Sequence, residues 1–378
     1  MGMSDTQIKV MVVEDSAYMR YVISEFLDSD PEIKVVEKAR DGVDALEKLA
    51  LGLPDVMTLD IQMPRMDGLK LLEEMRGRYR VPTIMVSSLT FEGAEDTIRA
   101  LELGAVDFVP KPSGVLAMTI DQLREEIIAK VKAASQIKPL ALAPPAESVQ
   151  DAEPGRKQEP GAGPRRAAPV AERIAQRKAA ARQALQEKAI PLKKVVAVGS
   201  STGGPRALTE IIPLLPADIP ACVVVVQHMP PKFTASLAER LDAISEIQVK
   251  EAANGDKIRP GIVYIAPGDY HILAGKNDVL YLSQDPPQHG VRPSVNVFMQ
   301  SVASVYGERG VGVVLTGMGT DGRSGALAIK EHGGYMLAEH ENSCVVYGMP
   351  RAAIEAGAVD RVAMLQRMAD EILTAIYS

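Results

Sequence analysis

The sequence predicts an α/β protein with two doubly wound parallel-sheet domains joined by a long linker. β-rich runs alternate with amphipathic stretches over residues 1–133, apolar periodicity disappears over residues 134–192, and the alternation resumes over residues 193–378. Alternating strands and helices are typical of parallel sheets with helices on both faces. A chain of 378 residues is long enough for two cores of ordinary size. We therefore expect two folded domains of the same class.

Five strand-and-helix units account for the first domain. Each begins with a short run rich in Val, Ile and Met and continues with apolar residues at helical spacing. The predicted strands are "IKVMVV", "KVVEKA", "DVMTLD", "PTIMVSS" and "AVDFVP". The predicted helices are Ser16–Leu27, Val43–Leu51, a helix from Gly68, Ala94–Leu103 and a closing helix that ends near Ala133. Parallel strands are joined by right-handed crossovers, so these units predict one doubly wound sheet.

The linker is rich in Pro, Ala and charged residues, as in "APPAESVQDAEPGRKQEPGAGPRR", and this composition cannot form a core. Its second half, "AERIAQRKAAARQALQEKA", favours a helix by propensity, but Ile174 and Leu185 are its only sizeable apolar residues. We interpret it as a solvated, partly helical spacer; a basic docking segment is the alternative. Beyond it, the predicted strands of the second domain are "KVVAVG", "ACVVVVQ", "IVYIAPG" and "VGVVLTGMG".

Composition and charge exclude several classes of protein. Hydrophobic residues make up 46% and charged residues 24%, which is typical of a globular protein, and no apolar run is long enough for membrane insertion. The net charge of -7 disfavours nucleic acid as a partner, because phosphate binding needs a basic surface. Cys222 and Cys344 are the only cysteines, so a disulfide framework or a cysteine zinc site is excluded. The N-terminus shows no secretion signal, so we expect a cytoplasmic protein.

Three carboxylates are predicted to meet at one edge of the first sheet. Glu14 and Asp15 end the first strand and Asp60 ends the third, and the carboxyl ends of parallel strands share one edge. Such a cluster is typical of a divalent cation site, and oxygen ligands favour Mg²⁺. Ser87 and Lys111 end the fourth and fifth strands and would add a hydroxyl and an ammonium group. Helix capping is the alternative explanation for an acidic residue such as Asp15.

These residues lie in "EDSAYMR", "DVMTLDIQMPRMDG", "MVSSLT" and "DFVPKP", and through them residues 8–130 resemble the receiver domains of two-component response regulators. The resemblance implies a flavodoxin-like fold in which Asp60 accepts a phosphoryl group from a histidine kinase. The other positions that it implies are Glu14, Asp15 and Asp60 as Mg²⁺ ligands, Ser87 and Lys111 as contacts of the phosphoryl oxygens, and Phe108 as the aromatic switch residue.

The loop "GSSTGG" in the second domain predicts a serine nucleophile presented on a tight turn. Residues 199–203 fit the pattern G-x-S-x-G, which places Ser201 on a sharp turn between a strand and a helix. A phosphate-binding P-loop would need Lys and then Ser or Thr after the second Gly, where this chain has Pro205 and Arg206. An ordinary loop serine is the alternative, so the prediction depends on a base that lies nearby.

His228 is the histidine best placed to be that base. It follows "CVVVVQ" directly and should stand at the carboxyl end of the strand beside that of Ser201. Asp321, in the glycine-rich "TGMGTDG", supplies a carboxylate at the same edge, with a helix N-cap as its alternative role. In such a set serine attacks, histidine transfers the proton and aspartate orients the imidazole. The Met318 N–H is a candidate donor to the oxyanion.

The second domain resembles the catalytic domain of chemotaxis protein-glutamate methylesterases. The stretches that carry the resemblance are "GSSTGG", "QHMPPKFTASLAERL", "YIAPGDYH", "RPSVNVF", "GVVLTGMGTDG" and "SCVVYGMPRAAIEAG". It implies a Rossmann-like serine hydrolase with Ser201, His228 and Asp321 as catalytic residues and with Thr202 and Met318 lining the site. The implied activity is hydrolysis of glutamate γ-methyl esters on chemoreceptors, with deamidation of receptor glutamines.

Together these observations predict a phosphorylation-activated serine hydrolase that acts in chemotactic adaptation. The expected partners are methyl-accepting chemoreceptors as substrate and a chemotaxis histidine kinase as phosphodonor. We expect Mg²⁺ in the receiver domain, no cofactor for the ester chemistry, and a monomer. The rival hypothesis is a response regulator whose second domain binds a nucleotide or a protein without catalysis, since doubly wound folds host many such functions.

Overall fold

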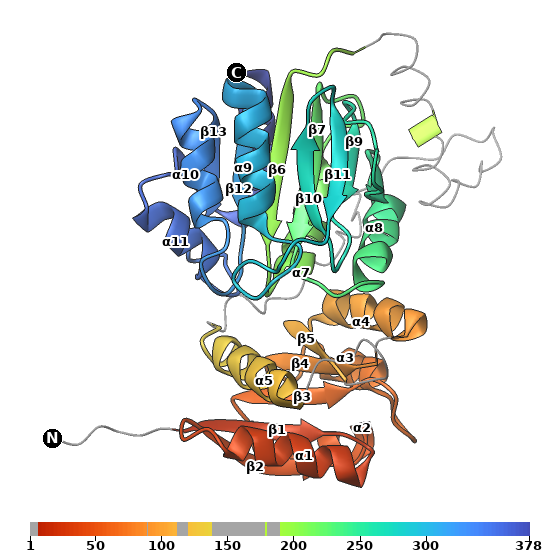
Figure 1. Ribbon diagram of the computed structural model, residues 1–378. Helices are drawn as coiled ribbons and strands as arrows, with labels where there is room; N and C mark the ends of the chain where they lie inside the picture. Colours follow the sequence, from red (N-terminus) through yellow and green to blue (C-terminus); the bar gives the residue numbers. More distant parts are fainter. Residues whose placement is uncertain (1–6, 89, 112–119, 138–177, 180–189) are drawn as a thin grey trace, which may run out of the picture.

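The computed structural model describes residues 7–88, 90–111, 120–137, 178–179 and 190–378. Two α/β domains are present, with the N-terminal domain below the C-terminal one in the view of Figure 1. Most of the predicted linker, residues 138–177 and 180–189, lies outside the described residues, and so does the prediction of a partly helical spacer. Lys178 is described, and its Nζ lies 2.8 Å from Asp242 Oδ1 of the second domain.

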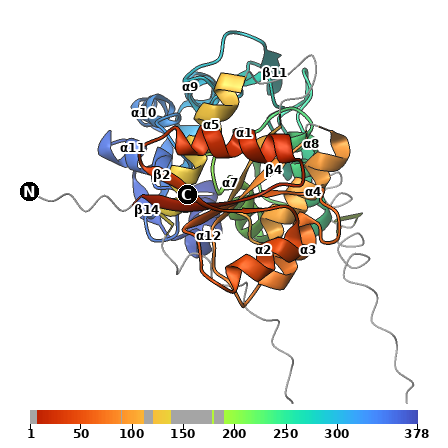
Figure 2. The ribbon, with the colours of Figure 1, turned by 90° about the horizontal axis from the view of Figure 1, so that it is seen from below.

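The first domain is a parallel sheet of five strands in the order β2-β1-β3-β4-β5, which confirms the predicted fold class. The strands are β1 (Ile8–Val13), β2 (Ile33–Ala39), β3 (Val56–Asp60), β4 (Thr83–Ser87) and β5 (Asp107–Pro110). The helices are α1 (Ala17–Asp28), α2 (Gly42–Leu49), α3 (Gly68–Met75), α4 (Phe91–Leu103) and α5 (Ile120–Ser135). Figure 2 shows α1 and α5 on one face of this sheet and α2 and α3 on the other.

Side-chain caps fix where these helices begin. Ser16, and not Asp15, caps α1, since its Oγ accepts a hydrogen bond from the Met19 N–H. Asp41 and Asp67 cap α2 and α3 in the same way. Because Ser16 supplies the first cap, the Asp15 carboxylate is left at the edge of the sheet beside Asp60.

The second domain is a parallel sheet of seven strands in the order β14-β13-β12-β6-β7-β9-β8, with a separate antiparallel hairpin of β10 and β11. The strands are β6 (Lys194–Ser200), β7 (Ala221–Gln227), β8 (Gln248–Glu251), β9 (Ile262–Ile265), β10 (His271–Gly275), β11 (Val279–Ser283), β12 (Gly310–Val314), β13 (Tyr335–Glu339) and β14 (Arg361–Ala363). The predicted strands correspond to β6, β7, β9 and β12. The edge strands β8 and β14 are short and carry polar residues, so their apolar signal is weak.

Helices and two short 3₁₀ turns connect these strands. The helices are α7 (Gly204–Ile211), α8 (Phe233–Ile244), α9 (Val295–Tyr306), α10 (Arg323–Glu331), α11 (Met349–Glu355) and α12 (Leu365–Tyr377), and the turns are Ile212–Leu214 and Gly307–Arg309. β6, β7 and β12 are adjacent in the sheet, so the loops that follow them leave its carboxyl edge side by side. Of the helices that the structure describes, none is both long and apolar enough to cross a membrane.

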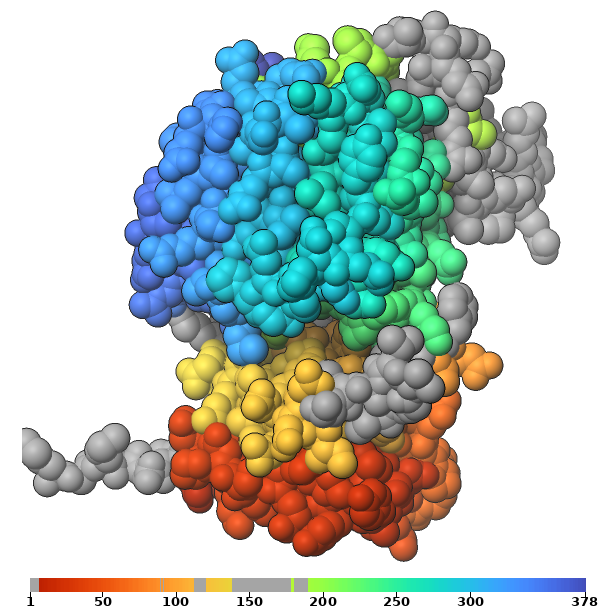
Figure 3. All heavy atoms as spheres, in the orientation of Figure 1, coloured from red at the N-terminus to blue at the C-terminus, as the bar shows by residue number. Residues whose placement is uncertain are grey.

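The two domains pack directly against each other (Figure 3). Helix α4 of the first domain lies beneath α7 and α8 of the second (Figure 1). The ring of Phe108 in β5 stacks on that of Phe233 in α8, with centroids 4.5 Å apart. Buried apolar residues of both domains form one contiguous cluster across this contact. A cavity of about 1000 Å³ lies beside it, lined by residues of both domains that include Tyr79, Leu101, Arg206 and Glu339.

Candidate functional site

The loop between β6 and α7 holds Ser201 at the carboxyl edge of the second sheet. The Ser201 N–H donates to the Thr316 carbonyl at 3.0 Å, which ties this loop to the one that follows β12. The turn needs its glycines: Gly203 has φ of 79°, and a Cβ on Gly204 would come within 1.9 Å of Gln227 Oε1. The serine is therefore fixed on a tight turn from strand to helix.

The structure places His228 directly after β7, the strand that pairs with β6, so that Ser200 stands opposite Gln227. Gln227 joins the two loops, since its Nε2 donates to the carbonyls of Ser201 at 3.0 Å and His228 at 3.3 Å. Its Oε1 accepts from Ser200 Oγ at 2.7 Å. Sequence reasoning missed this glutamine; the one available signal was its position between an apolar strand and the candidate base.

Asp321 lies in the loop after β12, and its Oδ2 is 2.9 Å from His228 Nε2. It does not cap its own helix by its side chain, because the N-cap of α10 is Gly322. The carboxylate caps α9 instead and accepts hydrogen bonds from Ser294 Oγ at 2.9 Å, Val295 N at 2.7 Å and Asn296 N at 3.0 Å. The alternative that Asp321 caps its own helix is therefore wrong, and its hydrogen bonds to the start of α9 coexist with the contact to histidine.

Burial by itself would raise the pKa of Asp321, but the hydrogen bond and charge of His228 and the N–H groups of Asn296 and Val295 outweigh it and lower the pKa below its usual value. An ionised Asp321 accepts a hydrogen bond from Nε2–H of His228, which leaves Nδ1 as the basic nitrogen of the neutral ring. Among the described residues no hydrogen bond joins Ser201 Oγ to His228. Such contacts are often long before substrate binds.

Thr202 follows Ser201 in the loop between β6 and α7, and Met318 lies in the neighbouring loop after β12. Thr202 is buried, and its Oγ1 donates to Asp107 Oδ2 of the first domain at 2.6 Å. Met318 is 42% exposed and follows Gly317, whose Cβ position would lie 2.8 Å from Ser201 Cβ. The backbone N–H groups of Thr202 and Met318 donate no hydrogen bond within the described part of the chain.

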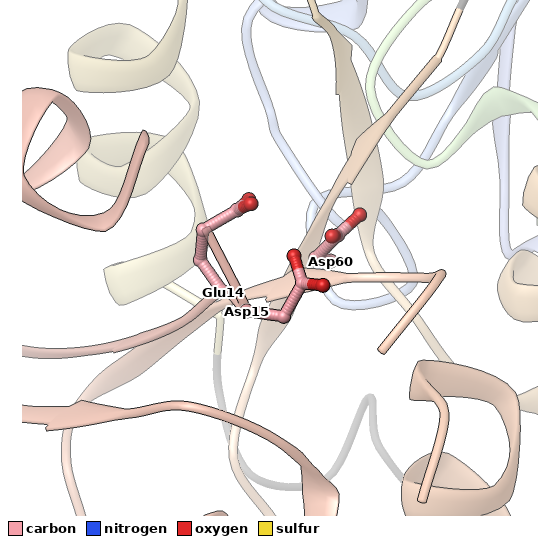
Figure 4. A group of neighbouring side chains, drawn as sticks. All are labelled: Glu14, Asp15 and Asp60. Atoms are coloured by element: carbon pink, nitrogen blue, oxygen red, sulfur yellow. The ribbon is translucent and has the colours of Figure 1, made fainter. Parts of the chain in front are cut away.

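A second cluster lies at the carboxyl edge of the first sheet (Figure 4). One ligand atom each from Glu14, Asp15 and Asp60 lies within 4.8 Å of the others. Lys111 Nζ is 2.9 Å from Glu14 Oε2 and 2.9 Å from Asp60 Oδ2. Burial, and then the charge of Asp60, raises the pKa of Glu14, and burial raises the pKa of Asp60. The cluster brings together carboxylate oxygens from three residues, and this donor set fits a small divalent cation.

The other two predicted receiver residues do not point into this pocket. Ser87 Oγ, buried at the end of β4, donates to the Gly93 carbonyl of α4 at 3.0 Å and accepts from Thr97 Oγ1 at 2.7 Å. Phe108 lies in the contact between the domains, against Phe233. Both side chains therefore connect the edge of the first sheet to α4 and to the second domain.

Glu339, at the end of β13, is a fully buried carboxyl group that the sequence analysis did not single out. Burial raises its pKa from 4.5 to about 6. The folded state therefore binds this proton more tightly than the unfolded state, so stability is lost as pH rises through about 6, by on the order of 2 kcal/mol.

We expect Glu339→Gln to gain stability relative to the parent chain at pH 8 but not at pH 4.5, measured by thermal unfolding. Exposed Glu331→Gln is the control, and an equal shift at both pH values would contradict the assignment.

Comparisons with known proteins match both domains. Residues 196–372 match the family model for CheB methylesterase, and residues 10–123 match that for the response regulator receiver domain. A protein-glutamate methylesterase/protein-glutamine glutaminase of Symbiobacterium thermophilum is 49% identical over 98% of this chain and 97% of its own length. One of Pyrococcus abyssi is 42% identical over 100% of this chain and 95% of its own length.

Among solved structures, the CheB methylesterase catalytic domain of Thermotoga maritima is 47% identical over 48% of this chain and 97% of that chain, with a TM-score of 0.47. The full-length relatives carry the assignment, because they cover both domains at well over 30% identity. They confirm the resemblance that the motifs indicated. The chain belongs to the family of hydrolases named protein-glutamate methylesterase/protein-glutamine glutaminase, in which a response regulator receiver domain precedes a CheB methylesterase domain.

Proposed function

We propose that this chain is a phosphorylation-activated serine hydrolase that converts glutamate γ-methyl esters of chemoreceptors to glutamate and methanol during sensory adaptation, and that also deamidates receptor glutamines. One observation carries the proposal. His228 is bound to an ionised Asp321 at the carboxyl edge of the sheet, in the loop beside that of Ser201. A base that is oriented in this way beside a mounted serine is the arrangement that acyl transfer requires.

In the first half of the reaction, Ser201 Oγ attacks the ester carbonyl carbon and its proton passes to His228 Nδ1. The carbonyl oxygen becomes an oxyanion, which the N–H groups of Thr202 and Met318 stabilise. Asp321 holds the resulting imidazolium through Nε2–H. The C–O bond to the methoxy group then breaks, and methanol leaves with the proton from His228, which yields a glutamyl ester of Ser201.

In the second half, His228 takes a proton from water as the water oxygen attacks the acyl carbon. The tetrahedral intermediate collapses, the bond to Ser201 Oγ breaks, and His228 returns the proton to that oxygen. The products are a receptor glutamate and free Ser201. A glutamine side chain follows the same steps with ammonia as the leaving group, which accounts for both activities in one site.

In this proposal the receiver domain regulates the hydrolase activity through its phosphorylation. Asp60 Oδ accepts the phosphoryl group from a histidine kinase, and Lys111 contacts its oxygens, since Lys111 already faces Asp60 at 2.9 Å. Glu14, Asp15 and Asp60 would hold Mg²⁺, which neutralises charge on the transferring phosphoryl group. To reach a phosphoryl oxygen, Ser87 Oγ must leave the Gly93 carbonyl and Thr97.

This movement of Ser87 would act on the contact between the domains. Ser87 is bonded to α4, and α4 packs against α8 and α7. The edge strand β5 also contacts the second domain: Phe108 stacks on Phe233, and Asp107 accepts a hydrogen bond from Thr202. Thr202 is the residue next to Ser201. We infer that the unphosphorylated receiver holds this face closed over the loop of Ser201 and that phosphorylation loosens it.

The proposed function is tested by methanol release from methylated receptors in membrane vesicles. We expect slow release by the chain alone and faster release after a small phosphodonor and Mg²⁺ are added. Ammonia release from receptors with glutamine at the same positions tests the deamidase activity. Receptors that retain their methyl groups under both conditions would contradict the proposal.

The closed contact predicts a gain of activity when it is weakened. Phe108→Ala removes the stack on Phe233, and an aromatic pair contributes about 0.5–1.5 kcal/mol beyond its buried area. We expect the unphosphorylated variant to release methanol about two- to tenfold faster, with a smaller response to phosphodonor. Labelling of Asp60 by phosphodonor checks that the variant receiver is folded. A basal rate equal to that of the parent chain would show that the contact does not restrain the enzyme.

A further inference from the structure

The mechanism above does not use Glu339, although it is fully buried beside the loops of the catalytic site. We propose that Glu339 is a positioning residue, which holds the Thr316 peptide so that the loop of Ser201 and the loop of Met318 keep the spacing needed for ester hydrolysis. The proposal rests on the proposed function of Ser201. It follows from the hydrogen bonds of Thr316.

Thr316 joins the two loops through hydrogen bonds of its carbonyl and hydroxyl groups. Its carbonyl accepts from the Ser201 N–H at 3.0 Å. Its Oγ1 donates to the Thr202 carbonyl at 2.9 Å and accepts from the Val346 N–H at 2.9 Å. Residues 201 and 202 therefore take their position from residue 316, which itself lies two residues before Met318. A small rotation of the Thr316 peptide would change the distance between the nucleophile and both proposed oxyanion donors.

The third polar group of Thr316, its N–H, donates to Glu339 Oε2 at 2.8 Å. The register explains why a side chain is needed here. β12 pairs with β13 only as far as Val314 and Ala338, so the Thr316 N–H lies beyond the end of the ladder. The preceding N–H, of Leu315, points the other way and donates to the Gly199 carbonyl. Glu339 thus replaces the strand carbonyl that the Thr316 N–H would otherwise lack.

This N–H depends on the carboxyl group because the surroundings offer little water. Thr316 and Glu339 are 1% and 0% exposed. A buried N–H without an acceptor costs the full desolvation of that group, so the loop would rotate to find another partner. Such a rotation moves the oxyanion donors more than it changes the surface that binds the receptor, and kcat should therefore fall more than KM rises.

Two substitutions separate the acceptor from the volume of the side chain. Glu339→Gln keeps an oxygen in place for the Thr316 N–H, whereas Glu339→Leu keeps a similar volume without an acceptor. In the full-length chain with phosphodonor, we expect methanol release by the Gln variant within about twofold of the parent rate. We expect the Leu variant to lose at least about tenfold in kcat, with KM changed by less than about threefold.

Leu337→Val is the matched control, because Leu337 lies on the same strand and is buried, but its hydrocarbon side chain has no atom that can accept a hydrogen bond from the Thr316 N–H. It should lower the thermal stability and keep kcat. Equal losses in the Gln and Leu variants, or a Leu variant that keeps the parent kcat, would overturn the proposal. If Glu339→Leu does not fold, the Gln variant still tests the proposal. Its kcat should equal that of the parent at pH 5.5 and at pH 8, since a neutral acceptor must suffice. Failure of the proposed function is separate: it would appear as full activity of Ser201→Ala.

Discussion

Ser201→Ala is expected to abolish methanol release almost completely, with a loss of about 10⁴ to 10⁶ in kcat. The reason is that the hydroxyl is the attacking group in the proposed mechanism, and the methyl group of alanine cannot attack the ester. Receptor binding should survive, because the substitution removes one oxygen atom. The measurement is methanol release by the phosphorylated full-length chain, with receptor binding by sedimentation as the check on folding.

The adjacent serine provides the matched control. Ser200 is fully buried and its hydroxyl donates to Gln227, so Ser200→Ala removes a hydroxyl one residue away that cannot attack substrate. It should keep more than about a tenth of the parent rate. His228→Ala should lose about as much as Ser201→Ala, because members of such a set act as a unit. A Ser201→Ala rate above roughly a tenth of the parent value would remove Ser201 as the nucleophile.

Asp60→Asn is expected to abolish phosphoryl labelling and, with it, the activation by phosphodonor. An amide cannot form the acyl phosphate, and the variant also removes one of the two carboxylates that pair with Lys111. Basal methanol release should remain, since the variant leaves Ser201, His228 and their partners unchanged. The measurement is incorporation of label from a small phosphodonor or from the kinase.

Asp55→Asn is the control for this experiment, because Asp55 directly precedes β3, at the end of the strand opposite to Asp60, and accepts a hydrogen bond from the Lys9 N–H. It should be labelled like the parent chain. Chelation of Mg²⁺ should stop labelling of the parent, as the cluster of Glu14, Asp15 and Asp60 implies. Labelling of Asp60→Asn at the parent level would contradict the assignment of the acceptor.

The sequence by itself determined the fold class and the position of each candidate residue along the chain. The alternation of strands and helices predicted both sheets, and motifs at strand ends identified Asp60 and Ser201. Their placement at the sheet edges follows because a parallel sheet brings the carboxyl ends of its strands to one edge whatever their separation in sequence. A residue that directly follows a buried strand, such as His228, is therefore placed by local pattern alone.

Only the tertiary structure decided how these residues are held. Asp321 caps α9, not its own helix, and Glu339 binds an N–H beyond the end of a strand ladder. The contact of Thr202 with Asp107 joins residues 95 positions apart. Such partners depend on strand order, on crossing of helices and on domain packing, and no spacing in the sequence encodes them. Hydrogen bonds of buried groups must be satisfied by whichever atoms the complete fold brings near, and those atoms are known only once the chain is folded.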